Sequence, residues 1–106
     1  MLVSVAEVKT DRASRYLTQL CKHFAHKVRA EWTDRQGRVE FDFGACTLVA
    51  QDAFLELTAA APDSEALARV EHVVGSHAER FGSRDGLTVT WQRRGSADSS
   101  APVSLS

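Results

Sequence analysis

Apolar side chains recur at helical spacing in two segments of the chain. From Thr10 to Lys27 they follow the i, i+3, i+4, i+7 pattern of a helix with one buried face, and Ser64 to Phe81 repeats this pattern. Thr10 or Asp11 is expected to cap the first helix, and Gly82 is expected to end the second in the left-handed conformation. The apolar positions are Ala13, Leu17, Leu20, Cys21 and Phe24 in the first segment and Ala66, Leu67, Val70, Val73, Val74, His77 and Phe81 in the second.

Four central segments alternate apolar and polar residues, which is the period-2 pattern of half-buried strands. Short turn sequences separate these four, so they are predicted to form an antiparallel meander. A valine-rich segment at the N-terminus and an alternating segment after the second helix add one strand at each end. The predicted strands span residues 1–9, 28–33, 39–43, 46–50, 54–59 and 87–91.

The predicted element order is β-α-ββββ-α-β. It predicts an α+β fold in two layers, a curved antiparallel sheet with both helices packed on one face. Residues 1–92 are expected to form this single domain. Residues 93–106 are rich in serine and alanine and have no periodicity, so they are predicted to be a disordered C-terminal tail.

Composition and charge exclude some functions without identifying one. The 106 residues carry a net charge of −1, with 43% hydrophobic and 25% charged residues, as in an ordinary small globular domain. This charge argues against broad nucleic-acid binding. No segment approaches the ~18 apolar residues of a membrane helix, and the N-terminal residues lack the pattern of an export signal. We therefore expect a cytoplasmic protein whose two cysteines are reduced.

His77 stands out because it interrupts the apolar face of the second predicted helix. We expect it to be mostly buried, and a buried imidazole needs a hydrogen-bonding partner. A backbone carbonyl or a strand side chain would satisfy it; alternatively, His77 would bind a ligand or a metal ion. With Cys21 and Cys46 it would form a soft three-ligand site suited to zinc, copper(I) or iron. Both cysteines also fit as small apolar core residues.

The first predicted helix carries two further candidate features. Cys21, His23 and His26 resemble a metal motif, but Cys21 and His23 point apart on a helix. Only the two histidines are therefore able to share an ion, and otherwise they are solvated. The face of this helix opposite its apolar stripe carries a row of basic side chains. This face is either a solvated surface or a docking site for an acidic protein partner or an anionic small ligand. Its basic row consists of Arg12, Arg15, Lys22 and His26.

Residue patterns typical of enzymes are weak in this sequence. It contains no Ser-His-Asp arrangement and no glycine-rich phosphate loop. A reactive cysteine needs a neighbouring base and a partly exposed pocket, whereas Cys21 is predicted to face the core. Glu40 and Asp42 share a strand face, but carboxylates on a sheet usually face solvent. Catalysis is therefore the least favoured function.

A resemblance to a known family rests on four segments, DRASRYLTQLCKHFAHK, GRVEFDFGACTL, HAERF and LTVTW. They make residues 1 to about 92 similar to the bacterial family called domain of unknown function 2218, with CKHFAHK and GACTL the most specific parts. The resemblance implies a cytoplasmic domain and a fold similar to the TATA-binding-protein-like and phosphohexomutase C-terminal-domain class. The family domain also occurs alongside siderophore-interacting flavin reductases, which implies a context of iron acquisition. The resemblance implies no catalytic residues for this sequence.

Together these features favour a non-enzymatic accessory or binding domain, linked through the resemblance to siderophore-iron handling. The alternative is a small metal- or haem-binding protein that uses His77 with Cys21 or Cys46. No cofactor is expected under the first interpretation, and a transition metal is expected under the second. An enzyme is the third possibility.

Overall fold

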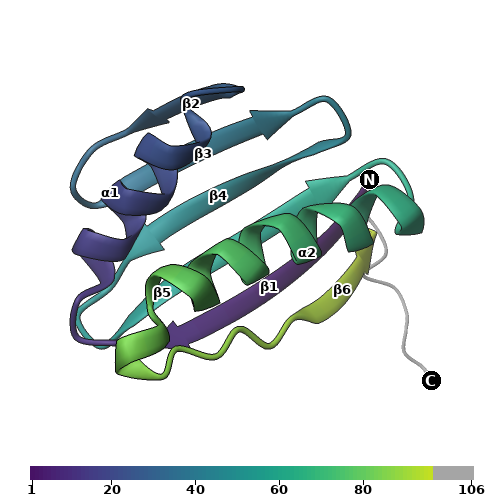
Figure 1. Ribbon diagram of the computed structural model, residues 1–106. Coiled ribbons are helices and arrows are strands. Elements are labelled where there is room, and N and C mark those ends of the chain that lie inside the picture. Colours follow the sequence, from purple (N-terminus) through teal and green to yellow (C-terminus); the bar gives the residue numbers. More distant parts are fainter. Residues whose placement is uncertain (97–106) are drawn as a thin grey trace.

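The computed structural model describes residues 1–96 of the chain (Figure 1). Its elements follow the predicted order, with one additional short 3-10 helix, η1, after the second helix. The strands are β1 (Leu2–Lys9), β2 (Arg29–Trp32), β3 (Gln36–Phe41), β4 (Gly44–Ala50), β5 (Phe54–Ala61) and β6 (Gln92–Ser96). The helices are α1 (Ala13–Phe24), α2 (Ser64–Phe81) and η1 (Ser83–Asp85).

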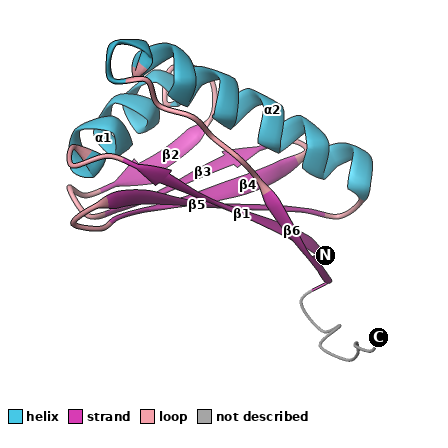
Figure 2. Cartoon of the chain, turned by 90° about the horizontal axis from the view of Figure 1, so that it is seen from below, coloured by secondary structure: helices cyan, strands magenta, loops and turns pink. Residues whose placement is uncertain are grey.

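The six strands form one antiparallel sheet in the order β2-β3-β4-β5-β1-β6. Strands β2 to β5 are the predicted meander, and β1 lies between β5 and β6. Both helices cover the same face of this sheet (Figure 2), so the predicted two-layer α+β fold is confirmed. Strand β5 shows why the helices cover only this face. Leu55, Leu57 and Ala59 point toward the helices and are fully buried, while the residues between them are only half-buried.

The hydrophobic core fills the space between the helices and the sheet. Each helix contributes its predicted apolar stripe, and removing this surface from water is the main driving force for packing the layers together. The largest fully buried side chains are Leu17, Leu20 and Cys21 of α1, Leu67, Val70 and Val74 of α2, and Val8, Val39, Cys46, Leu48, Leu55 and Leu57 of the sheet.

Helix α1 is shorter at both ends than the sequence pattern indicates. Its N-cap residue is Arg12, which makes no side-chain capping bond, so the predicted cap by Thr10 or Asp11 is wrong. Thr10 Oγ1 instead accepts a hydrogen bond from the Arg12 amide at 3.0 Å, forming a local turn before the helix. The helix ends at Phe24, which places His26 and Lys27 in the turn that follows.

Helix α2 spans the predicted residues, and Asp63 caps it by accepting a hydrogen bond from the Ala66 amide at 2.8 Å. Gly82 does follow the helix, but its φ of −99° is not left-handed, so that prediction is wrong. Glycine is needed there because a Cβ would lie 2.2 Å from Leu87 Cδ1. The left-handed residue is Gly86, at φ 68°. No helix among residues 1–96 is both long and apolar enough to cross a membrane.

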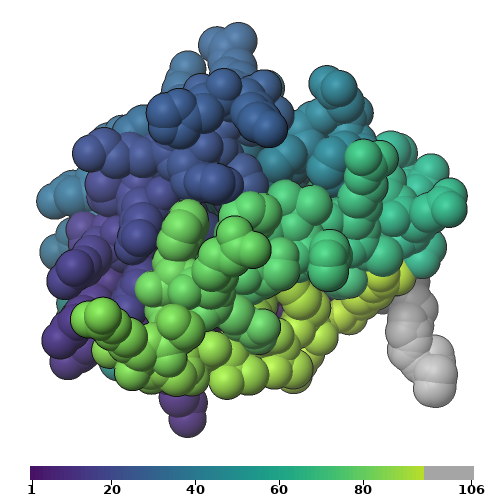
Figure 3. All heavy atoms as spheres, viewed as in Figure 1, coloured from purple at the N-terminus to yellow at the C-terminus, as the bar shows by residue number. Residues whose placement is uncertain are grey.

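The segment after η1 differs most from the prediction. Residues 87–91 are not a strand; they run beside α2, as the space-filling view shows (Figure 3). Leu87 is buried, and Glu79 of α2 accepts a hydrogen bond from the Val89 amide at 2.9 Å, so this amide is satisfied without strand pairing. The last strand is β6, which pairs with β1. The predicted tail therefore begins too early at residue 93, and its remainder, 97–106, lies outside the described residues.

Arg93 joins β6 to α2. Its guanidinium donates to both carboxylate oxygens of Glu71 at 3.2 Å and to Ser64 Oγ at 2.7 Å. A two-pronged contact of this kind fixes geometry better than a single ion pair. Burial alone would raise the pKa of Glu71, but the bonds from Arg93 lower it below its usual value.

Tyr16 joins α1 to η1. Its ring is buried, and its hydroxyl donates a hydrogen bond to the carboxylate of Asp85. Arg12 lies 3.8 Å from the same carboxylate. The pKa of Tyr16 is raised, first because this bond holds its proton and then because of burial and the negative charge of Asp85. Two segments that are distant in the sequence are thereby joined at one end of the helical layer.

Candidate functional site

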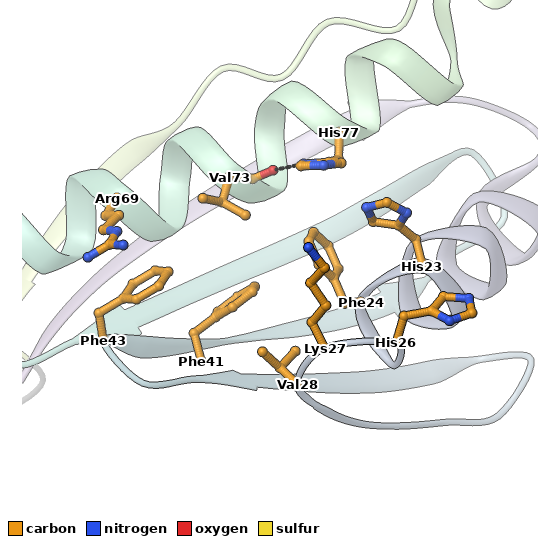
Figure 4. Close-up of a pocket in the computed structure, with 10 residues that line it drawn as sticks. All are labelled: His23, Phe24, His26, Lys27, Val28, Phe41, Phe43, Arg69, Val73 and His77. Carbon is orange, nitrogen blue, oxygen red and sulfur yellow. Dashed lines mark hydrogen bonds between the residues drawn. The ribbon is translucent and has the colours of Figure 1, made fainter.

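A groove of about 760 Å³ opens on the helical side of the molecule (Figure 4). It lies where the C-terminal end of α1, the middle of α2 and the hairpin between β3 and β4 meet. Its floor is apolar and largely aromatic, and its rim is basic. The apolar lining consists of Phe24, Val28, Phe41, Phe43 and Val73.

Three phenylalanine rings form the floor. Phe24 packs edge-on against Phe41, with ring centroids 5.3 Å apart, and Phe41 stacks on Phe43 at 5.1 Å. Phe41 ends β3 and Phe43 lies in the two-residue turn that follows, so their side chains lie on the same side of the hairpin. Phe24 is buried, but Phe41 and Phe43 are only partly buried and present apolar surface to the groove.

The rim carries positive charge at both ends. Arg69 of α2 lies over the Phe43 ring, 4.4 Å from its centroid, in a cation–π contact. Lys27 and the histidines lie toward the opposite end (Figure 4). No acidic side chain is among the described residues that line the groove. The basic lining residues are His23, His26, Lys27, Arg69 and His77.

His77 and His23 meet at the end of the groove away from Arg69. Their ring centroids are 4.7 Å apart, and the His77 ring also packs against Phe24 at 5.2 Å. His77 is part-buried, in agreement with the prediction that it is mostly buried, and the rest of its surface lines the groove. It lies at the boundary of the apolar stripe because α1 ends beside it and leaves this part of α2 open. Its polar partner is a backbone carbonyl, since Nδ1 donates to Val73 O at 2.7 Å.

His23 has an unusual charge environment for an exposed residue. Its pKa is lowered, first by the partial burial of its ring and then by the positive groups around it. Among these groups, His77 from the other helix has the largest effect on the pKa of His23. The others are His26, Arg80 and Lys27. This end of the groove is therefore positively polarised even when His23 itself is neutral.

The two cysteines lie in the core and not in the groove. Both are free and buried, and burial raises the pKa of Cys21 to about 11 and of Cys46 to about 12. Cys21 Sγ packs over Gly37 of β3, where a Cβ would lie only 2.7 Å from the sulfur. Among residues 1–96, no three His, Cys, Asp or Glu side chains are placed to hold a metal ion. The predicted site of Cys21, Cys46 and His77 is therefore not formed.

The predicted basic row is divided by the structure. His26 lies beyond the end of α1 and lines the groove, while Arg12 lies near Asp85. Arg15 and Lys22 are exposed, and neither has an acidic partner within 4.0 Å among the described residues. Docking of an acidic partner on these two side chains stays a prediction.

Sequence reasoning singled out the three groove histidines, each for a different reason, but missed the other members of the site. Lys27 and Arg69 were not among the predicted site residues. Phe41 and Phe43 were covered only by the predicted strand 39–43, whose alternation is typical of a half-buried strand. A usable signal was present, because the second phenylalanine is followed at once by Gly44, and an aromatic residue in a hairpin turn is rarely fully covered.

Comparison with known proteins places all groove residues within one matched region. Residues 5–92 match the family described as "Uncharacterized protein conserved in bacteria (DUF2218)". Among solved structures, the chain is similar to the NMR structure of PA4090 from Pseudomonas aeruginosa, at 34% sequence identity and a TM-score of 0.74. That match covers 87% of this chain and 96% of the other. No curated protein matches the chain.

Proposed function

This chain belongs to the bacterial family of uncharacterised proteins DUF2218, and we propose that it is a non-enzymatic binding domain that holds a small molecule in the groove. The observation that carries this proposal is the aromatic floor. Phe41 and Phe43 stack on each other yet stay partly exposed, so a bound apolar molecule would remove their remaining surface from water.

The size and lining of the groove also support a small ligand. Its volume of about 760 Å³ falls within the range usual for small-molecule sites, ~300–1,000 Å³. Such sites combine an apolar lining with a few polar groups that fix orientation, and here the basic rim residues supply those groups. A catalytic role has less support, because both cysteines are buried and no carboxylate lines the groove among the described residues.

The resemblance to domains that accompany siderophore-interacting flavin reductases supplies a biological context for this ligand. We place the domain in the bacterial cytoplasm and in iron acquisition. Catechol-type iron chelators combine an aromatic ring with anionic oxygens, and such a molecule would match both the floor and the rim of this groove. Growth of a deletion strain on a catecholate siderophore as its iron source should then be slower than wild type, while growth on ferrous iron should be unchanged.

Binding itself is tested by amide NMR titration with neutral 2-naphthamide and with 2,3-dihydroxybenzoate. We expect both to shift resonances of residues around Phe41 and Val73. Val73→Phe should fill the groove and weaken binding about fivefold, because the added ring occupies the ligand volume. The matched control is Val49→Phe on the uncovered face of the sheet, which should leave the affinity unchanged. If neither probe shifts the groove resonances, or if both variants bind like wild type, the proposal is wrong.

A further inference from the structure

We propose that the groove binds an aromatic carboxylate, with its carboxylate seated on His23 and His77 and its ring on the phenylalanine floor. A proton is taken up by the histidine pair when the ligand binds. This inference rests on the proposed function, since it names the ligand class of the same groove and makes its affinity depend on pH.

The charge around the groove selects an anion. The helices that pack against the histidine pair present only basic or neutral groups to it, and the β3–β4 hairpin adds phenylalanine rings. Asp42, at the hairpin turn, lines a different hollow. Uncompensated positive charge beside an apolar floor attracts an anionic group and holds it better than it would be held in water. The basic groups are His23, His26, Lys27, Arg69, His77 and Arg80.

The tautomer of His77 makes anion binding depend on a proton. Because Val73 O is an acceptor, the nitrogen 2.7 Å from it, Nδ1, must carry a hydrogen. In the neutral ring Nε2 then holds a lone pair, which repels a carboxylate. It has no hydrogen-bond partner among the described residues. Adding a proton turns Nε2 into a donor, and an imidazolium donates a strong hydrogen bond to a carboxylate.

The histidine pair disfavours carrying two positive charges until an anion is present. The two rings lie 4.7 Å apart, so two imidazolium charges repel each other at close range. The pKa of His23 is lowered first by the burial of its ring and then by its closeness to His77. A carboxylate bound at the edges of both rings offsets the repulsion, so the anion and the proton favour each other's binding.

The remaining groove fits the ring of the ligand. Figure 4 shows Phe41 and Phe43 between the histidine end and Arg69, with Lys27 alongside. A flat aromatic body lying on Phe41 and Phe24 would reach toward the Arg69–Phe43 contact without displacing it. Aromatic pairs gain stabilisation beyond the burial of their surface, which favours an aromatic over an aliphatic acid.

The experiment compares 2-naphthoate, which is ionised from about pH 6 to about pH 8, with neutral 2-naphthamide. Calorimetric titrations of the full chain are run at both pH values and in two buffers of different ionisation enthalpy. We expect 2-naphthoate to bind about tenfold more tightly at the lower pH, with a buffer-dependent heat that reports proton uptake. The affinity for 2-naphthamide should be the same at both pH values.

Histidine variants test whether the pH dependence of 2-naphthoate binding comes from the His23–His77 pair. His77→Gln and His23→Gln should each remove most of the pH dependence for 2-naphthoate while amide NMR shows an intact fold. His72→Gln, an exposed position on α2 outside the groove lining, should keep it. A full pH dependence in both groove variants, or 2-naphthamide binding as tightly as 2-naphthoate at the lower pH, overturns the inference but leaves small-molecule binding standing. If neither probe binds at either pH, the proposed function fails with it.

Discussion

At the scale of single residues, Cys21 and Cys46 show how burial decides the chemistry of a side chain. With pKa values of about 11 and about 12, only about one thiol in a thousand or fewer is ionised near pH 8. Because the thiolate is the reactive form, we predict that Ellman's reagent labels neither cysteine in the folded protein within the time that it labels both in urea. Added zinc should leave the native labelling unchanged. Prompt labelling without denaturant would contradict this and revive a role for the thiols.

The residue scale also shows what the sequence can reveal about the site. A histidine within an apolar stripe is visible in the sequence, so His77 could be singled out. Its surroundings could not, because they depend on where α1 ends and on which side chains face it from other elements. Lys27 and Arg69 belong to the groove only through this tertiary arrangement.

At the scale of elements, the segment after α2 shows the limit of periodicity. Residues 87–91 alternate like a strand, yet they pack along α2, because Leu87 fills the space above Gly82 and Glu79 binds the Val89 amide. Neither contact can be read from the alternation itself. The strand forms only at β6, where Arg93 reaches Glu71.

This arrangement predicts that β6 stabilises the domain. Arg93→Ala should lower the melting temperature only slightly, because the Arg93 side chain is partly exposed and its ion pair with Glu71 is screened by solvent. Arg94→Ala, on the same strand, is the matched control and should be close to neutral. Removing residues 97–106 should leave the melting temperature almost unchanged, whereas removing 92–106 should lower it clearly. Equal melting temperatures for the two truncations would contradict a structural role for β6.

At the scale of the whole molecule, the layers could be predicted and the groove could not. Alternation in four consecutive segments and two apolar helical stripes permit few arrangements other than helices on one face of an antiparallel sheet. The position of β1 between β5 and β6 and the groove depend on contacts between segments far apart in the sequence. Periodicity within a segment carries no information about such contacts.

The stability of the whole domain should fall at alkaline pH because of Tyr16, which joins α1 to η1. Its folded pKa is raised by the bond to Asp85, so the folded state holds its proton above the unfolded pKa of ~10. The stabilisation is fully present below that pH and is lost as pH rises through the folded pKa. Urea unfolding should therefore show that Tyr16→Phe costs about 1 kcal/mol near neutral pH and less at about pH 11.

The chain contains one tyrosine, so ultraviolet absorbance follows this single titration directly. Asp85→Asn is the informative control, because the amide oxygen still accepts the hydrogen bond while the negative charge is gone. It should bring the absorbance midpoint of Tyr16 closer to that of the urea-unfolded chain. A midpoint in the folded wild type equal to that of the unfolded chain would show that the Tyr16–Asp85 bond does not hold the proton. The alkaline loss of stability would then have to arise from other groups.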